Sequence, residues 1–465
     1  MQNLRWMLVM AIMGKLLFAS AAVASQISPE MPKTLKVVGA TPLPETIAEA
    51  VDVSPVWSGH SVGFSLLTQG DNQFVAFYDA ERNLTVAQRK LGEKTFHLTR
   101  LPTQIGWDSH NYVTMALDDE GYLHLSGNMH GVPLIYFRST RPLDASSLQR
   151  VPQMTGELEN HVTYPQFFRG PHQEFLFTYR DGGSGNGNQI YNVYDVKTRV
   201  WRRLLDKPLM DGQGQRNAYA SLPTPGPDGF FHIVWVWRET PDASTNHDPS
   251  YARSRDLVHW ENSRGEPLEL PITLATSDIV DPVPQGGGVI NGNVAIGFDD
   301  QKRAIVSYHK YDANGNTQIY NARLENGRWK IYQTSDWNYR WDFGGNGSIP
   351  FEVHLGGVKR EADGTLTQSY ANKKYGSGTW ILDPQTLKPT GQKPPAAGYP
   401  PSLRAVETKW PEMGVRWSGD SGSSGQPDAR YVLRWETLPT NRDQPRPAPY
   451  PPASMLRVYK LQKAR

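Results

Sequence analysis

Short β-rich runs recur along the chain from about residue 50 to residue 384, and their spacing constrains the fold more than any other feature. The starts of successive runs are separated by roughly 50 to 75 residues, the length of a four-stranded propeller blade with its loops. No helical periodicity is sustained for more than a turn or two. We therefore predict an all-β fold, a seven-bladed β-propeller in a single domain. Examples of the runs are QFVAFYD (73–79), YLHLSG (122–127), EFLFTYR (174–180), FFHIVWVW (230–237), AIVSYHK (304–310) and TLTQSYA (365–371).

The C-terminal part of the chain is expected to complete the ring of blades. Residues 385–430 are rich in Pro, Gly and Ser and are predicted to be largely loop. Two further β runs, at 430–438 and 454–462, are joined by the Pro-rich segment TNRDQPRPAPYPPA. We expect the segment 430–465 to supply ring-closing strands, because closure removes exposed sheet edges. A ring that closes on itself favours a monomer.

Residues 1–24 have the pattern of a secretory signal peptide. A short segment containing Arg5 precedes an apolar run that Lys15 interrupts and that ends in Ala22-Val23-Ala24, a small-x-small cleavage pattern. A mature domain over 25–465, secreted or periplasmic, is therefore predicted. The absence of cysteine is compatible with that compartment, since a chain of this length can bury a large core without disulfides.

Charge and aromatic content restrict the class of ligand. Without Arg5 and Lys15 the chain has 46 basic and 46 acidic residues, so bulk charge favours neither nucleic acid nor a membrane surface as partner. Any anionic ligand must be bound by a local basic cleft. The 14 Trp and 21 Tyr provide aromatic faces of the kind that stack on sugars.

Two histidines flank a predicted hairpin in the segment 107–138. Strands at 113–117 and 122–127 surround the turn Asp-Asp-Glu-Gly, and His110 precedes the first strand whereas His130 follows the second. The outer ends of a hairpin lie close in space, so the two imidazoles are expected to converge at one rim of the sheet. Small polar neighbours indicate a solvated cleft, and two of them, Asn111 and Asn128, are expected to bind substrate. The alternative is two loop histidines with no shared role.

Further candidates for ligand binding lie at strand ends and in Gly-bearing polar segments. Tyr164 and Arg180 stand 16 residues apart, and Arg180 ends a β run just before a Gly-rich loop, where a guanidinium can hold a carboxylate by two hydrogen bonds. A surface turn arginine and a core tyrosine are the alternatives. Residues also expected to bind substrate are Arg216, Asn217 and Tyr219 in GQRNAYAS and Trp341 in NYRWDFGGNGS.

Three histidines, His232, His247 and His309, are candidate zinc ligands that could face a central channel. Neutral imidazoles bind zinc together with a carboxylate or water, but these residues lack a short-spacing motif. Hydrogen-bonded packing histidines are the alternative. The sequence contains no P-loop, no Rossmann glycine pattern and no GxSxG serine motif.

The combination of WDSHN, GNMHG, TYPQF and YRDGGSGNGN resembles the β-propeller ulvan lyases of marine bacteria, a BNR-repeat-4-like group of polysaccharide lyases. The similarity extends from residue 56 to residue 461. The resemblance implies a seven-bladed propeller that cleaves a sulfated rhamnose–uronate polysaccharide by β-elimination. Members of the group can hold a structural zinc partly through cysteine; this chain has none, and Ser250 is the residue expected at such a place.

Elimination at a uronate explains why these four residues would act together. Arg180 would neutralise the carboxylate, His110 would remove the C5 proton, Tyr164 would protonate the leaving O4, and His130 would assist with the carboxylate or share the base role. No metal or organic cofactor is required. Three alternatives remain: a lyase acting on rhamnose–glucuronate plant gum, a sialidase-like glycoside hydrolase, and a non-catalytic sugar-binding propeller. Only elimination gives an unsaturated uronate that absorbs in the ultraviolet.

Overall fold

The computed structural model describes residues 35–463, so the predicted signal peptide at 1–24 lies outside the described residues. Within the described range the chain is built of strands. Its one α-helix is the four-residue α1 (Pro401–Arg404), and three short 3-10 helices are present at Ala145–Ser147, Ala243–Thr245 and Leu274–Thr276. The predicted all-β class is confirmed. In residues 35–463 no helix has the length and apolar composition that crossing a membrane requires.

Five sheets of four or five antiparallel strands account for much of the described chain. The first two are β2 (Ser65–Gln69), β3 (Asn72–Tyr78), β4 (Asn83–Lys90) and β5 (His97–Gln104), and β6 (Val113–Leu117), β7 (Leu123–Gly127), β9 (Tyr136–Ser139) and β10 (Leu148–Val151). Two more are β23 (Ala295–Phe298), β24 (Ala304–Tyr311), β25 (Thr317–Glu325) and β26 (Arg328–Gln333), and β27 (Val353–Leu355), β28 (Lys359–Arg360), β29 (Leu366–Asn372), β30 (Gly376–Leu382) and β31 (Pro389–Gln392). The fifth is β1 (Glu45–Val56), β34 (Ser454–Lys463), β33 (Ala429–Thr437) and β32 (Gly414–Gly419).

A sixth sheet of 13 strands contains most of the candidate site. Two groups of strands merge into this sheet through a single parallel pairing of Gly187 in β13 with Asn217 in β16. The pairing pattern of residues 35–463 therefore gives six sheets, none closed on itself, instead of seven separate ones. The strands are β8 (His130–Val132), β11 (Val162–Arg169), β12 (Phe175–Gly183), β13 (Asn186–Asp195), β14 (Val200–Arg203), β15 (Met210–Asp211), β16 (Asn217–Ala220), β17 (Thr224–Pro225), β18 (Phe231–Arg238), β19 (Asn246–Ser254), β20 (Trp260–Glu261), β21 (Pro267–Leu268) and β22 (Asp278–Ile279).

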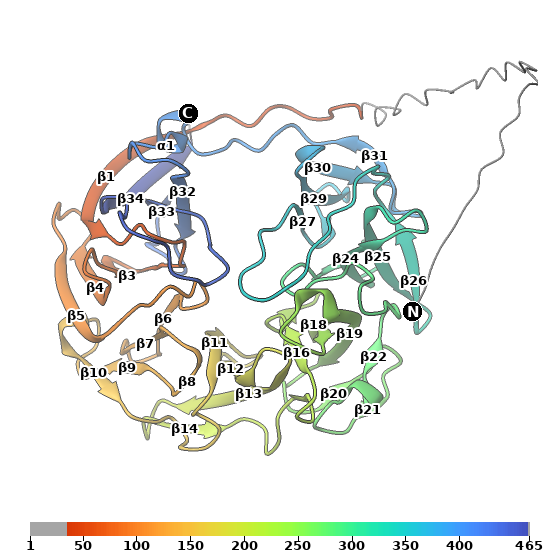
Figure 1. Cartoon of the computed structure of the whole chain (residues 1–465), viewed down its shortest axis with the longest axis horizontal. Coiled ribbons are helices and arrows are strands. Elements are labelled where there is room, and N and C mark those ends of the chain that lie inside the picture. The colour runs from red at the N-terminus through yellow and green to blue at the C-terminus, as the bar shows by residue number, and fades with distance from the viewer. Residues whose placement is uncertain (1–34, 464–465) are drawn as a thin grey trace, which may run out of the picture. The chain divides into compact units, whose positions relative to one another are not determined.

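The sheets of the unit 35–463 follow one another in chain order, as the colours of Figure 1 show. The N-terminal strand β1 leaves this order, because it pairs with the C-terminal β34 from Glu45–Lys463 to Val56–Ser454. The region 385–430, predicted to be largely loop, contains β31, α1, β32 and the first residues of β33, with irregular segments between them.

The hydrophobic core lies between neighbouring sheets. Strand β3 is buried at every position, because side chains on both of its faces pack against other strands. One apolar cluster joins β2, β3 and β4 to β6, β7 and the C-terminal strands. This packing gives the hairpin of β6 and β7 a fixed support, and the candidate site is built at its open end.

Candidate active site

The hairpin brings the two histidines together. Strand β6 pairs with β7 from Val113–Gly127 to Leu117–Leu123, so the residues outside its open end meet. The rings of His110 and His130 lie with their centroids 4.4 Å apart. Asp108 stands between them: one oxygen lies 2.8 Å from His110 Nδ1, and the other lies 2.5 Å from His130 Nδ1. One carboxylate thus orients both imidazoles.

A second carboxylate contacts His110 and acts on its charge together with Asp108. Asp443 Oδ2 lies 3.3 Å from His110 Nδ1. Burial disfavours the imidazolium, but the hydrogen bonds and charges of Asp108 and Asp443 outweigh burial and raise the pKa of His110 to about 9. Conversely, although burial opposes it, the imidazoles hold the pKa of Asp108 below its ordinary value. His110 is therefore a cation at neutral pH, which disfavours the predicted role of this residue as the base.

Tyr164 is aimed by a β-bulge. In the pairing of β11 with β12, Thr163 is opposite Arg180 and Gln166 is opposite Thr178, so Tyr164 and Pro165 share one partner position. The backbone of Tyr164 has a φ of 57°, a left-handed conformation that is costly for a bulky residue and typical of functional sites. Its ring centroid lies 5.8 Å from that of His110. Burial raises the pKa of the Tyr164 phenol, with Arg180 acting in the opposite direction, so the group is a neutral proton donor.

Arg180 is a buried cation without a carboxylate partner in the part of the chain that the structure describes. The residue is 2% exposed, and its Nε has no hydrogen-bond partner among residues 35–463. Nη1 lies 3.3 Å from the Tyr219 hydroxyl, and Nη2 donates to Thr163 Oγ1 at 3.0 Å. The guanidinium carbon lies 5.0 Å from the Tyr164 ring centroid. A buried charge without a counter-charge is energetically costly, so this site favours the binding of an anion.

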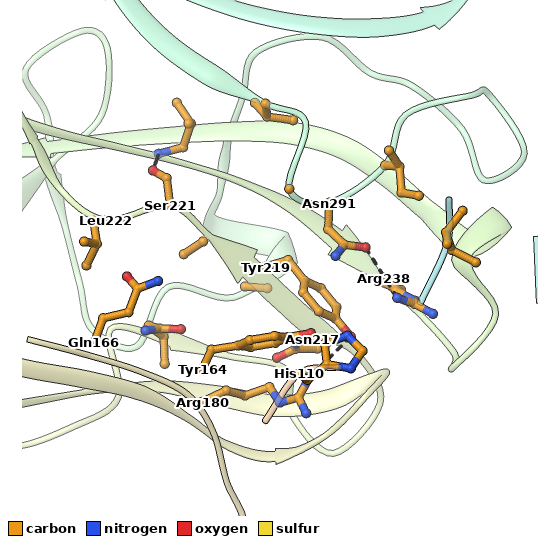
Figure 2. A pocket seen from close by; sticks show the side chains of 18 of the residues that line it. His110, Tyr164, Gln166, Arg180, Asn217, Tyr219, Ser221, Leu222, Arg238 and Asn291 are labelled. Atoms are coloured by element: carbon orange, nitrogen blue, oxygen red, sulfur yellow. Dashed lines mark hydrogen bonds between the residues drawn. The ribbon is translucent and has the colours of Figure 1, made fainter. Parts of the chain in front are cut away.

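His110, Tyr164 and Arg180 line a cavity of about 550 Å³, within the usual range for small-molecule sites. Figure 2 shows His110, Tyr164 and Arg180 near one another, and two guanidiniums flank Tyr219, with Arg180 5.8 Å and Arg238 5.5 Å from its ring. Burial raises the pKa of Tyr219, but the two guanidiniums outweigh burial and lower it. Asn217 is buried, and within the described part of the chain both polar atoms of its amide lack a partner, so the wall offers further hydrogen bonds to a polar ligand.

Several residues of the site were absent from the sequence-based set. Arg238 ends the run FHIVWVWR as Arg180 ends FLFTYR, so the same strand-end argument could have found it. Gln166, which lies within TYPQF, also lines the cavity, as do Gln189 and Asn291, which no motif marks. Asp108 and Asp443 are identified only by their contacts with the imidazoles.

Four of the predicted substrate-binding residues do not line the cavity. Trp341 is 2% exposed and packs in the core against His309 and Phe343, so it offers no face to a sugar. Arg216 is engaged by Glu239 at 2.7 Å. The remaining two, Asn128 and Asn111, lie outside the cavity wall; Asn128 donates to Thr103 and Gln104, and the Asn111 carbonyl accepts from Tyr78.

The three predicted zinc ligands are not brought together. His232 lies beside Tyr251 and Asp228, His247 lies between Glu239 and Asp248, and His309 is buried beside Trp341. Hydrogen bonds account for the positions of His232 and His247, and packing against aromatic rings accounts for that of His309. Among residues 35–463, the one group with suitable ligand spacing is Asp108, His110 and His130, whose ligand atoms lie within 4.8 Å of one another. There each Nδ1 already faces its own oxygen of Asp108, so hydrogen bonds account for the cluster.

Comparison with known proteins identifies the family. The model of the BNR repeat-containing family, BNR_4, matches residues 72–337, more than half of the chain. The chain belongs to this family. The short isoform of an ulvan lyase from Alteromonas sp. (strain LOR) is 35% identical over 71 residues, a match that covers 14% of this chain and 13% of that relative.

Solved structures share the fold over nearly the whole chain. The polysaccharide lyase Uly1 aligns with a TM-score of 0.56 at 14% identity, over 95% of this chain and 94% of its own. A PL25 ulvan lyase aligns with a TM-score of 0.56 at 14% identity, over 89% of this chain and 96% of its own. A PL25 ulvan lyase bound to -[GlcA(1-4)Rha3S]- aligns with a TM-score of 0.55 at 13% identity, with the same coverage.

Proposed function

We propose that this protein is a polysaccharide lyase that cleaves a uronate-containing polysaccharide by β-elimination. The observation that carries the proposal is Arg180, a buried guanidinium without a carboxylate partner among the described residues. It lies near the rings of Tyr164 and Tyr219, and His110, which contacts Tyr164, lines the same cavity. A uronate carboxylate would supply the missing anion. Neutralising that carboxylate acidifies the C5 proton and stabilises the enolate-like intermediate.

The remaining groups supply the proton transfers. His130 is the better base, because its Nδ1 faces Asp108, so that Nε2 carries the lone pair of the neutral ring. The C5 proton moves to His130, the C4–C5 double bond forms, and the C4–O4 bond breaks. Tyr164 donates its proton to O4, and cationic His110 assists Arg180 at the carboxylate. No step in this scheme requires a metal or an organic cofactor.

Ulvan is the proposed substrate, and rhamnose–glucuronate plant gum is the alternative. The names of the relatives support ulvan, and one neighbour is bound to an acidic oligosaccharide. Two guanidiniums, Arg180 and Arg238, in one cavity wall suit an acidic polymer. The protein is proposed to act as a secreted or periplasmic monomer, without a nucleic-acid or membrane partner.

The proposal includes a seven-bladed propeller. The 13-stranded sheet divides at the single Gly187–Asn217 pairing into a group before β16 and a group from β16 onward. With the five smaller sheets these groups make seven, and the pairing of β1 with β34 would close the ring as in other propellers.

Ultraviolet absorbance of unsaturated uronate, followed while purified protein acts on ulvan, tests the function. The expected result is a rise with wild-type protein that is lost in Arg180→Met and His130→Gln. A rise on glucuronate-bearing gum alone would change the substrate but keep the chemistry. New reducing ends without absorbance would establish a hydrolase, and binding without either product would establish a sugar-binding propeller.

A further inference from the structure

Asp443 connects three segments that are far apart in the sequence. It lies between β33 and β34, next to Arg442. Both residues have left-handed backbones, with a φ of 53° at Arg442 and 60° at Asp443. Consecutive non-glycine residues in this conformation are strained, and such strain persists where surrounding contacts hold it. Contacts of this turn reach two loops of the candidate site, the one that carries His110 and the one that carries Ser348.

The carboxylate of Asp443 has every oxygen occupied. Oδ1 accepts from Ser109 N at 3.1 Å, Ser109 Oγ at 2.7 Å and Ser348 Oγ at 2.5 Å. Oδ2 accepts from Ser348 N at 2.9 Å and lies 3.3 Å from His110 Nδ1. One side chain thus fixes the loop that carries His110 to the loop that carries Ser348, a residue of the cavity wall.

Arg442 strengthens the same connection. Its Nη1 donates to the carbonyls of Gly344 at 2.9 Å and Asn346 at 3.2 Å. Gly347 lies so close beneath this turn that an added Cβ would stand 2.3 Å from the Arg442 carbonyl oxygen. The turn 441–444 therefore holds the loop 344–348 against the cavity from outside.

We infer that Asp443 is a positioning residue of the active site, which holds the His110 ring in place and fixes the loop 344–348 as part of the cavity wall. Its role in turnover rests on the proposed lyase function; its effect on His110 does not. The charged and titratable groups that face His110 are Asp108, Asp443, His130 and Tyr164. Asp108 is shared with His130, so Asp443 is the carboxylate that distinguishes the two imidazoles.

The first test is an NMR titration of the His110 imidazole nitrogens in the full chain. Asp443→Asn keeps the size of the side chain and removes its charge. An opposite charge at this distance shifts a pKa by about 1 to 3 units, so we expect the His110 midpoint to fall by about 1 unit or more. Asp443→Glu restores the charge and should recover at least half of the shift. Asp428→Asn, the same change at an exposed carboxylate of the C-terminal region, should leave the midpoint unchanged.

The second test is kinetic and uses the same variants. We expect Asp443→Asn to lower kcat about 10-fold or more, with a smaller change in KM, and to move the alkaline limb of the pH profile toward lower pH. An unchanged His110 midpoint in folded Asp443→Asn would overturn the inference, whatever the activity. If no polysaccharide is cleaved by wild type, the lyase proposal fails, while the titration still decides the role of Asp443.

Discussion

Replacing Arg180 with methionine should separate stability from function. Most buried arginines are held by a carboxylate, and removing them destabilises the fold. Arg89 in β4 is an example: it is 1% exposed and pairs with Glu49 at 3.2 Å. Arg180 is 2% exposed and has no such partner among residues 35–463. The two residues are a matched pair for the same substitution.

The magnitudes follow from the contacts. Arg180→Met removes two hydrogen bonds from a charged group, worth about 1.5–3 kcal/mol each, and also removes a desolvation penalty of several kcal/mol. These effects nearly cancel, so the free energy of unfolding should change by less than about 1 kcal/mol. Arg89→Met leaves Glu49 with one cation fewer and should lower the free energy of unfolding by about 3 kcal/mol. In contrast, kcat/KM on the cleaved polysaccharide should fall about 100- to 1000-fold in Arg180→Met.

Urea unfolding followed by fluorescence measures the stability, and uronate absorbance measures the activity. Arg180→Lys keeps the charge without the two-pronged geometry and should recover only part of the lost rate. A loss of stability in Arg180→Met as large as that in Arg89→Met would show that Arg180 is a structural cation. Full activity in folded Arg180→Met would refute its role at the carboxylate.

Three further changes test other parts of the site. The pKa of His110 is raised from 6.5 to about 9, so protonation of this ring contributes about 3 kcal/mol to the free energy of unfolding. This contribution is complete below pH 6.5 and is lost as the pH rises through 9. Free energies of unfolding measured at about pH 6 and about pH 10 should show this decline in wild type and a flatter dependence in His110→Gln. Tyr164→Phe should retain the melting temperature within a few degrees and lower kcat about 100-fold or more; near-normal kcat would exclude the phenol as the acid. Gly187→Ala removes no chemical group, but its Cβ would stand 2.7 Å from Asn217 Oδ1 and 2.9 Å from Arg180 Cγ. These side chains would have to shift, so kcat/KM should fall about 10- to 100-fold. An unchanged kcat/KM would show that this packing does not position Arg180.

Much of the fold could be predicted from local pattern. The predicted run 73–79 is observed as Asn72–Tyr78, and the run 365–371 as Leu366–Asn372. Apolar β runs bounded by turns identify strands because this signal is local. The number of separate sheets could not be predicted, because the pairing of Gly187 with Asn217 depends on how two groups of strands pack.

The candidate site divides in the same way. The histidine pair was accessible because a hairpin of adjacent strands determines it, and Tyr164 and Arg180 meet across the pairing of β11 with β12. Trp341 is predicted to bind substrate but is buried in the core, because composition cannot distinguish a core tryptophan from one that stacks on a sugar. Asp443 meets Ser109 across 334 positions of sequence, and no periodicity indicates such a contact.

The pairing of β1 with β34 has a consequence for folding. Until the last strand arrives, β1 has an unpaired edge, and such an edge invites pairing with another chain. The strand carries three acidic residues, Glu45, Glu49 and Asp52, which would repel a second copy of itself. In the finished protein each acid meets a cation from elsewhere: Arg430 at 2.5 Å, Lys94 at 2.5 Å and Arg457 at 2.6 Å. The charges that discourage association of incomplete chains thus become ion pairs in the folded protein, with Arg457 of β34, Arg430 of β33 and Lys94 of the segment between β4 and β5.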